Sequence, residues 1–130
     1  MCKSKEQTLA NQFILKGLKT PLDPKRYWAP LEDSVLMLLD DFFNKKIDTK
    51  TTGKIGKILY EFQYFTYELY CVDPELFKVL DYLVVLYNPS VLRTKAKNSV
   101  KIRQAVKLLK NYYESKKSRV DFLRVYFSKQ

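Results

Sequence analysis

Apolar residues recur along this chain at intervals of three and four, the spacing that places them on one face of an α-helix. The clearest row lies in the middle of the chain, and the lysines and glutamates between its members fall on the opposite face. This row consists of Ile55, Ile58, Leu59, Phe62, Phe65 and Leu69. No segment shows the two-residue alternation of a convincing β-strand. The pattern predicts an all-α fold, a single-domain bundle of five to six helices over residues 1–130.

Proline and capping residues predict where these helices begin and end. A capping box opens at Ser4, Pro30 suits a first helical turn, Asp73-Pro74 starts another helix, and Ser118 is expected to cap the last one. The predicted segments are residues 4–16, 30–46, 49–69, 74–87, a region 90–113 with a break favoured near 98–99, and 118–127.

Residues 1–30 are expected to pack on this bundle as an N-terminal helix followed by a proline-rich loop. The loop contains Pro21, Pro24 and Pro30, and Tyr27 and Trp28 are expected to clamp it onto the body through their large rings. A separate run of aromatic residues surrounds the helix predicted over 49–69. Because one buried face cannot hold all of these rings, some of them are available for contact with another protein.

The distribution of charge gives the first functional indication. The chain has 24 Lys and Arg against 14 Asp and Glu, a formal net charge of +10. Residues 1–89 hold 12 basic and 12 acidic side chains, whereas residues 90–130 hold 12 basic and only 2 acidic ones. A positive segment of this kind attracts polyanions, and nucleic acid is the natural candidate. The alternative is a lysine-rich surface that only keeps the protein in solution.

The residue types present argue against catalysis. The chain has no histidine, which removes the commonest general base and the usual zinc ligand. Cys2 and Cys71 are too few for a disulfide framework or a zinc cluster, and the three glycines lack the spacing of a phosphate-binding loop. No apolar run approaches the length of a membrane span. We therefore expect a cytoplasmic protein that is not an enzyme, with no metal, no cofactor, no small-molecule substrate and no membrane contact.

A first pair of candidate nucleic-acid contacts lies at the start of the central helix. Lys54 and Lys57 belong to the segment Gly53-Lys54-Ile55-Gly56-Lys57, near a helix end whose backbone N–H groups also attract phosphate. The alternative is an ion pair between Lys57 and Glu61 on the helix surface.

The remaining candidates lie in the basic C-terminal third. Arg103, Lys107 and Lys110 align on one exposed ridge through their four- and three-residue spacing. A second row, formed by Arg93, Lys97 and Lys101, aligns only if the helix continues unbroken through residue 99. Since the chain shows no base-reading motif, these side chains are expected to contact the phosphate backbone irrespective of sequence.

Three short motifs between residues 42 and 129 carry a family resemblance. The segment Thr49-Lys50-Thr51-Thr52-Gly53-Lys54 opens a central helix with threonines and basic residues, and a leucine-rich helix leads through Tyr87 to Arg93. The terminal segment Asp121-Phe122-Leu123-Arg124-Val125-Tyr126 runs from an acid to a tyrosine. In these features the chain resembles the small helical subunit of type III-A CRISPR interference complexes, the Csm small-subunit family.

The resemblance implies a non-catalytic, RNA-binding subunit of an antiviral defence complex. Such a subunit stacks in copies along the complex and lines the groove that holds the guide RNA (crRNA) and its target RNA. Its partners would be these RNAs, the other subunits of the effector complex and copies of itself. Two alternatives stay open from the residues alone: a helical DNA-binding or replication accessory protein of a virus or plasmid, and a protein-interaction bundle in which the lysines only solubilise.

Overall fold

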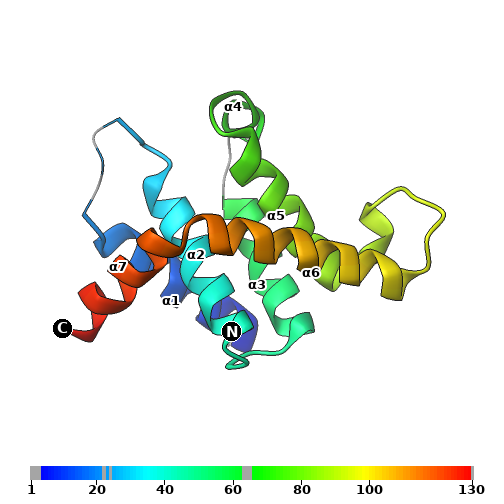
Figure 1. Cartoon of the computed structure of the whole chain (residues 1–130), viewed down its shortest axis with the longest axis horizontal. Coiled ribbons are helices and arrows are strands. Elements are labelled where there is room, and N and C mark those ends of the chain that lie inside the picture. The colour runs from blue at the N-terminus through cyan, green and yellow to red at the C-terminus, as the bar shows by residue number, and fades with distance from the viewer. Residues whose placement is uncertain (1–3, 22, 24, 63–65, 130) are drawn as a thin grey trace.

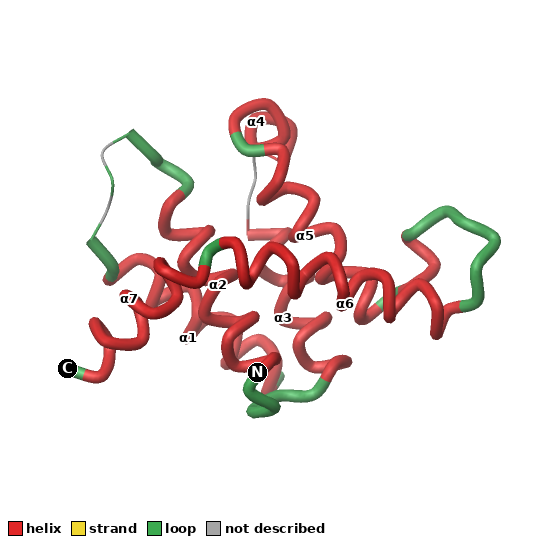
Figure 2. Tube along the Cα trace, in the orientation of Figure 1, coloured by secondary structure: helices red, strands yellow, loops and turns green. Residues whose placement is uncertain are grey.

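The computed structural model describes residues 4–21, 23, 25–62 and 66–129, with the side chains of 66–68 left aside. Within these ranges the chain forms α-helices and no β-strand, which confirms the all-α prediction (Figure 2). The helices are α1 (Lys5–Lys19), α2 (Ala29–Phe43), α3 (Thr49–Phe62), α4 (Thr66–Val72), α5 (Pro74–Tyr87), α6 (Asn98–Ser115) and α7 (Lys117–Ser128), with a short 3-10 helix, η1 (Pro89–Val91). The described residues thus contain seven α-helices rather than five to six.

Several helix ends are set by the residues that predicted them. Ser4 caps α1 by accepting a hydrogen bond from the Gln7 backbone N–H at 3.0 Å. Asp73 caps α5 in the same way through the Leu76 N–H at 3.1 Å, and Pro74 occupies the first turn of that helix. These caps satisfy backbone donors that a helix start would otherwise leave without partners.

Other boundaries differ from the prediction. Within the segment predicted as one helix over 49–69, the described residues form α3 (Thr49–Phe62) and α4 (Thr66–Val72). Residues 63–65, which include Phe65, predicted to face the core, lie outside the described residues. The favoured break before α6 is confirmed, because the chain becomes helical only at Asn98. The predicted cap at Ser118 is wrong: α7 starts one residue earlier, and no side-chain hydrogen bond caps it.

The arrangement of the helices places α6 on the outside of the bundle. In Figure 1 α6 runs across the front of the molecule, over α2 and α5, and α7 continues from its end toward the C-terminus. Both α2 and α5 contact α6, and they also contact α1 and α3 respectively. The fully buried apolar side chains between these helices include Leu36, Leu38, Leu39, Ile55, Leu59, Leu76, Leu80, Leu83, Leu109 and Leu123.

Two glycines allow α3 and α5 to approach closely. A Cβ atom on Gly53 would lie 2.4 Å from the backbone nitrogen of Tyr87, and one on Gly56 would lie 2.5 Å from the Cβ of Leu83. Any larger residue would collide at both positions, so the glycines set the distance between the two helix axes. The Gly-Lys-Ile-Gly segment therefore has a packing function that the sequence interpretation did not assign to it.

The proline-rich connection between α1 and α2 is held by polar side chains rather than by the expected aromatic clamp. Tyr27 is 63% exposed, so its predicted clamping role is wrong, whereas Trp28 packs partly buried against the core. Arg26 pairs with the buried Glu32, and the Thr20 hydroxyl donates to Asp33 at 2.6 Å. None of the helices in the described ranges is long and apolar enough to cross a membrane.

Candidate nucleic-acid interface

Three cations predicted to form a ridge are exposed together on α6. Arg103, Lys107 and Lys110 are exposed, whereas Ala105 and Leu109 of the same helix are fully buried. Because successive residues turn by about 100°, Arg103 and Ala105 point in nearly opposite directions. The three cations, called here the α6 ridge, therefore face away from the core and extend about 10 Å along the helix axis.

Among the described residues, no carboxylate forms an ion pair with the α6 ridge. The ion pairs found within 4.0 Å among these residues leave out all three cations. Glu114 follows in the same helical row, eleven residues after Arg103, and it is the single acid of α6. The ridge therefore carries uncompensated positive charge that ends at Glu114.

The segment before α6 adds three more exposed cations. Arg93, Lys95 and Lys97 are exposed on the loop between η1 and α6, and Lys97 occupies the N-cap position of α6. This loop projects beyond the N-terminal end of α6 at the right of Figure 1. No carboxylate of the described residues pairs with these three side chains. Loop and ridge together place six cations at one end and one side of the molecule.

The second row expected from an unbroken helix, Arg93, Lys97 and Lys101, does not form. Arg93 lies in the loop rather than on a helix, because η1 and the following bends end the regular backbone that a row requires. Lys101 lies on α6 but is only 7% exposed, since its position falls in the same stripe as Ala105 and Leu109. Of the three residues proposed for that row, Arg93 and Lys97 stay accessible on the loop and Lys101 is withdrawn from the surface.

The candidate lysines of α3 are engaged with other groups. Lys54 Nζ lies 3.6 Å from Glu6 Oε1, and Lys57 Nζ lies 3.7 Å from Glu61 Oε1, which is the alternative pairing considered for Lys57. Both ammonium groups also lie over the ring of Tyr87, at 6.0 and 5.5 Å from its centroid. Each of these lysines therefore has a carboxylate partner, which the cations of the α6 ridge do not have among the described residues.

The start of α3 is likewise occupied. The Asp48 carboxylate accepts a hydrogen bond from the Thr51 backbone N–H at 2.7 Å, and this bond lowers the pKa of Asp48 below the ordinary value. An ionised carboxylate at a helix N-terminus satisfies one of the backbone donors and offsets the positive dipole end that would attract an anion. Lys54 and Lys57 lie beyond that first turn, so the structure does not bring them together with a free helix end.

The cations of α7 meet buried acids of α2. Arg119 donates two hydrogen bonds to Asp33, from Nε to Oδ1 at 2.9 Å and from Nη2 to Oδ2 at 2.7 Å. Asp33 is completely buried and also accepts the Thr20 hydroxyl. This bidentate pair joins α7 to α2 and removes the charge of Arg119 from the surface field. A pairing between residues 86 positions apart leaves no signal in a single sequence.

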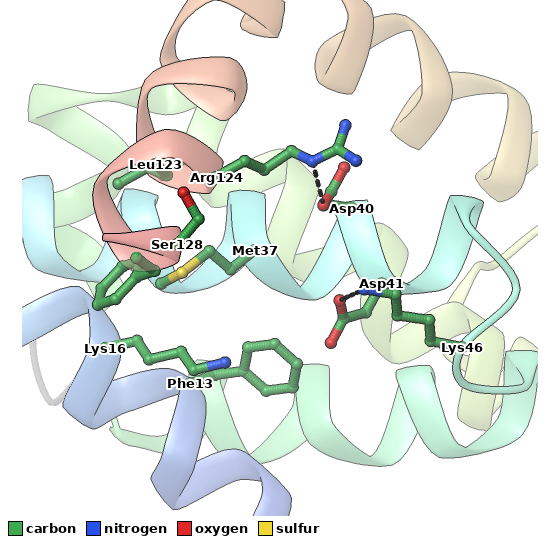
Figure 3. Close-up of a pocket in the computed structure, with 10 residues that line it drawn as sticks. Phe13, Lys16, Met37, Asp40, Asp41, Lys46, Leu123, Arg124 and Ser128 are labelled. Atoms are coloured by element: carbon green, nitrogen blue, oxygen red, sulfur yellow. Dashed lines mark ion pairs between the residues drawn. The ribbon is translucent and has the colours of Figure 1, made fainter. Parts of the chain in front are cut away.

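A groove between α1, α2 and α7 shows the same matching of charges (Figure 3). Arg124 Nε lies 3.7 Å from Asp40 Oδ2, and Lys46 Nζ lies 3.9 Å from Asp41 Oδ1, as the dashed lines in Figure 3 mark. The groove has a volume of about 320 Å³, and Phe13, Met37, Leu123 and Phe127 contribute apolar lining. Burial raises the pKa of Asp41, although Lys46 and Lys16 act in the opposite direction.

The site therefore consists of the α6 ridge and the basic loop before it. Sequence spacing identified the ridge, and it identified Arg93 and Lys97 of the loop, but it missed Lys95. Comparison with protein-family models, with curated proteins and with solved structures finds no match to this chain.

Proposed function

We propose that this protein is a non-catalytic nucleic-acid-binding protein that holds the phosphate backbone of an RNA duplex. The observation that carries the proposal is the set of six exposed cations on the α6 ridge and the preceding loop, none of which has an ion-pair partner among the described residues, whereas every cation of the neighbouring helix α7 is paired. Phosphates placed along this surface would release counterions from the nucleic acid, and this release supplies affinity without sequence preference.

The shape of the surface supports a duplex ligand. Three of the six cations lie on the outward-facing side of α6 and the other three on the loop that precedes it, and such a ridge suits the backbone of an A-form helix, which proteins recognise through shape and phosphate contacts. Both aromatic residues of α6, Tyr112 and Tyr113, are buried, so they offer no platform on which unpaired bases could stack.

The family resemblance narrows the proposal further. If the chain is a Csm-type small subunit, the duplex is the pairing of guide RNA with target RNA, and the other partners are subunits of that complex and further copies of this chain. The finding that would support this narrower proposal is a CRISPR effector gene cluster around the coding sequence. Guide RNA that co-purifies with the protein would support it independently.

The decisive experiment reverses two charges of the α6 ridge. The variant Lys107→Glu/Lys110→Glu is compared with Lys50→Glu/Lys78→Glu, a control of identical net charge whose lysines are exposed on α3 and α5. Binding to an RNA duplex is measured over a range of salt concentrations. We expect the slope of log affinity against log salt to fall by about two in the ridge variant.

The control should bind nearly as the unchanged protein does. Equal losses in both variants would show that only the overall charge matters. An absence of salt-dependent binding to any nucleic acid would reject the proposal in favour of a solubilising surface.

A further inference from the structure

A second row of side chains runs beside the α6 ridge. Gln104, Leu108 and Asn111 each follow a ridge residue by one position, so they repeat the same four- and three-residue spacing. All three are exposed, and Leu108 exposes 41% of its surface. This set, called here the amide row, is turned by about 100° from the ridge around the helix axis. A ligand whose one edge lies along the α6 ridge therefore brings its adjacent surface against the amide row.

The chemistry of the amide row differs from that of the ridge. Its amide groups each offer a carbonyl acceptor and two N–H donors, and Leu108 offers an apolar surface between them. None of the three contributes charge, so the row adds nothing to the attraction for phosphate. A surface of this composition suits the part of a nucleic acid that is polar, uncharged and partly apolar, namely the sugars and the base edges.

The geometry of an A-form duplex places such groups next to the phosphates. Its minor groove is wide and shallow, and it displays the 2′-hydroxyl groups along both of its edges. A 2′-hydroxyl can donate to the amide oxygen or accept from the amide nitrogen, and the sugar carbons can contact Leu108. B-form DNA has no 2′-hydroxyl, and its minor groove is too narrow to admit an α-helix.

We propose that the amide row of α6 makes the protein select RNA duplexes over DNA duplexes by hydrogen bonding to 2′-hydroxyl groups. This inference rests on the proposed function, because the ridge must first hold the phosphates in place. Gln104 and Asn111 are the specificity-determining residues, and Leu108 packs on the sugars between them. The ridge supplies affinity, and the amide row supplies discrimination.

The test uses the full chain and three duplexes of the same 20-base-pair sequence: RNA, 2′-O-methyl RNA and DNA. For the unchanged protein we expect RNA to bind about tenfold more tightly than DNA, which corresponds to roughly two hydrogen bonds of ordinary strength. The 2′-O-methyl duplex keeps the A-form shape but has lost the hydroxyl donor, and we expect it to bind more weakly than RNA. The variant Gln104→Ala/Asn111→Ala should bind RNA and DNA almost equally, with an unchanged salt slope.

Gln12→Ala, which removes an exposed amide from α1, is the matched control and should retain the preference for RNA. Equal binding of RNA and DNA by the unchanged protein, with a normal salt slope, would overturn the inference and leave the proposed function intact. So would a preference for RNA that survives in the double variant. Loss of salt-dependent binding to all three duplexes would instead reject the proposed function itself.

Discussion

Helices α6 and α7 are both rich in cations, but only α6 leaves them unpaired. On α7, Arg119 and Arg124 reach the buried or nearly buried Asp33 and Asp40 of α2, and Lys117 pairs with Asp121 on its own helix. The α6 ridge meets no carboxylate in the described part of the chain. The excess positive charge of residues 90–130 is therefore divided: the arginines of α7 form ion pairs with α2, and the cations of the α6 ridge remain exposed to solvent.

The difference follows from what each helix presents to α2. α7 directs arginines toward α2, whose acids at positions 33 and 40 lie two turns apart on one face. α6 packs through a stripe that includes Ala105 and Leu109, and so the three cations of its ridge point outward. The net charge of a sequence segment therefore does not by itself predict how strongly the segment attracts polyanions. Acidic side chains from distant parts of the chain can pair with its cations, as those of α2 do with α7.

The largest effect that tests this contrast is on stability. Arg119→Ala would leave the fully buried Asp33 without its cation, and removal of one partner from a buried pair costs about 3–5 kcal/mol of unfolding free energy. Urea denaturation measures the loss. Lys117→Ala, which removes an exposed pair from the same helix, should cost only about 0.3–0.5 kcal/mol. Similar losses in the two variants would contradict the assignment of Arg119 to an internal role.

A second test concerns α3, where Lys54 and Lys57 are paired, as the cations of α7 are. Gly53→Ala would place a Cβ 2.4 Å from the Tyr87 nitrogen and 2.8 Å from the Leu86 carbonyl carbon. Because these are backbone atoms, we expect a loss of about 1–3 kcal/mol in unfolding free energy. The salt slope of RNA binding should stay unchanged in the folded protein. If Gly53→Ala were as stable as the unchanged protein but bound RNA more weakly, the start of α3 would belong to the phosphate interface after all.

A third test extends the α6 ridge. Glu114 ends the row of Arg103, Lys107 and Lys110, so Glu114→Lys should add one phosphate contact and raise the salt slope by about one. Affinity for an RNA duplex, measured by fluorescence anisotropy, should rise. The control Glu75→Lys changes the net charge equally on α5, where the side chain is also exposed. If both variants gain equally, the location of the charge is irrelevant and the ridge has no special role.

The smallest effect is expected in the groove beside α7. Burial raises the pKa of Asp41 above its value in the unfolded chain, so the folded state binds the Asp41 proton more tightly and loses stability as the pH rises through this range. Asp41→Asn should therefore be as stable as the unchanged protein or slightly more stable near pH 7. The difference should shrink as the pH falls through the ordinary Asp pKa of about 3.9 and vanish well below it, where the carboxyl is protonated in both states.

Thermal unfolding of Asp41→Asn at several pH values provides the measurement. Asp40→Asn, which weakens contacts with Arg124 and with the Tyr113 hydroxyl that donates at 2.6 Å, should lose stability near neutral pH. A loss of equal size in Asp41→Asn would show that the pair with Lys46 outweighs the burial of this carboxyl.

Local signals in the sequence predicted much of the fold. The caps at Ser4 and Asp73 and the break before Asn98 are short-range features, because each depends on backbone groups within a few residues. The clamp assigned to Tyr27 was wrong, because the residues that hold this loop are a threonine and an arginine whose acidic partners lie on α2.

The candidate site was predicted in part for the same reason. Spacing within one helix correctly predicted that Arg103, Lys107 and Lys110 are exposed. The same spacing places Lys101 in one stripe with the buried Ala105 and Leu109, a signal that its assignment to the second row did not use. It also could not place Glu6 beside Lys54, since that contact joins two helices.

By itself, the sequence determined which segments become helices, which face of each is apolar and that the last third carries the excess of positive charge. These properties depend on periodicity, caps and composition, which act over a few residues. Only the tertiary structure decided which cations remain available to a polyanion. That choice depends on carboxylates that packing brings from distant positions. α2 supplies them to α7, whereas the α6 ridge lies on the side of α6 opposite the buried Ala105 and Leu109 and keeps its charge in solvent.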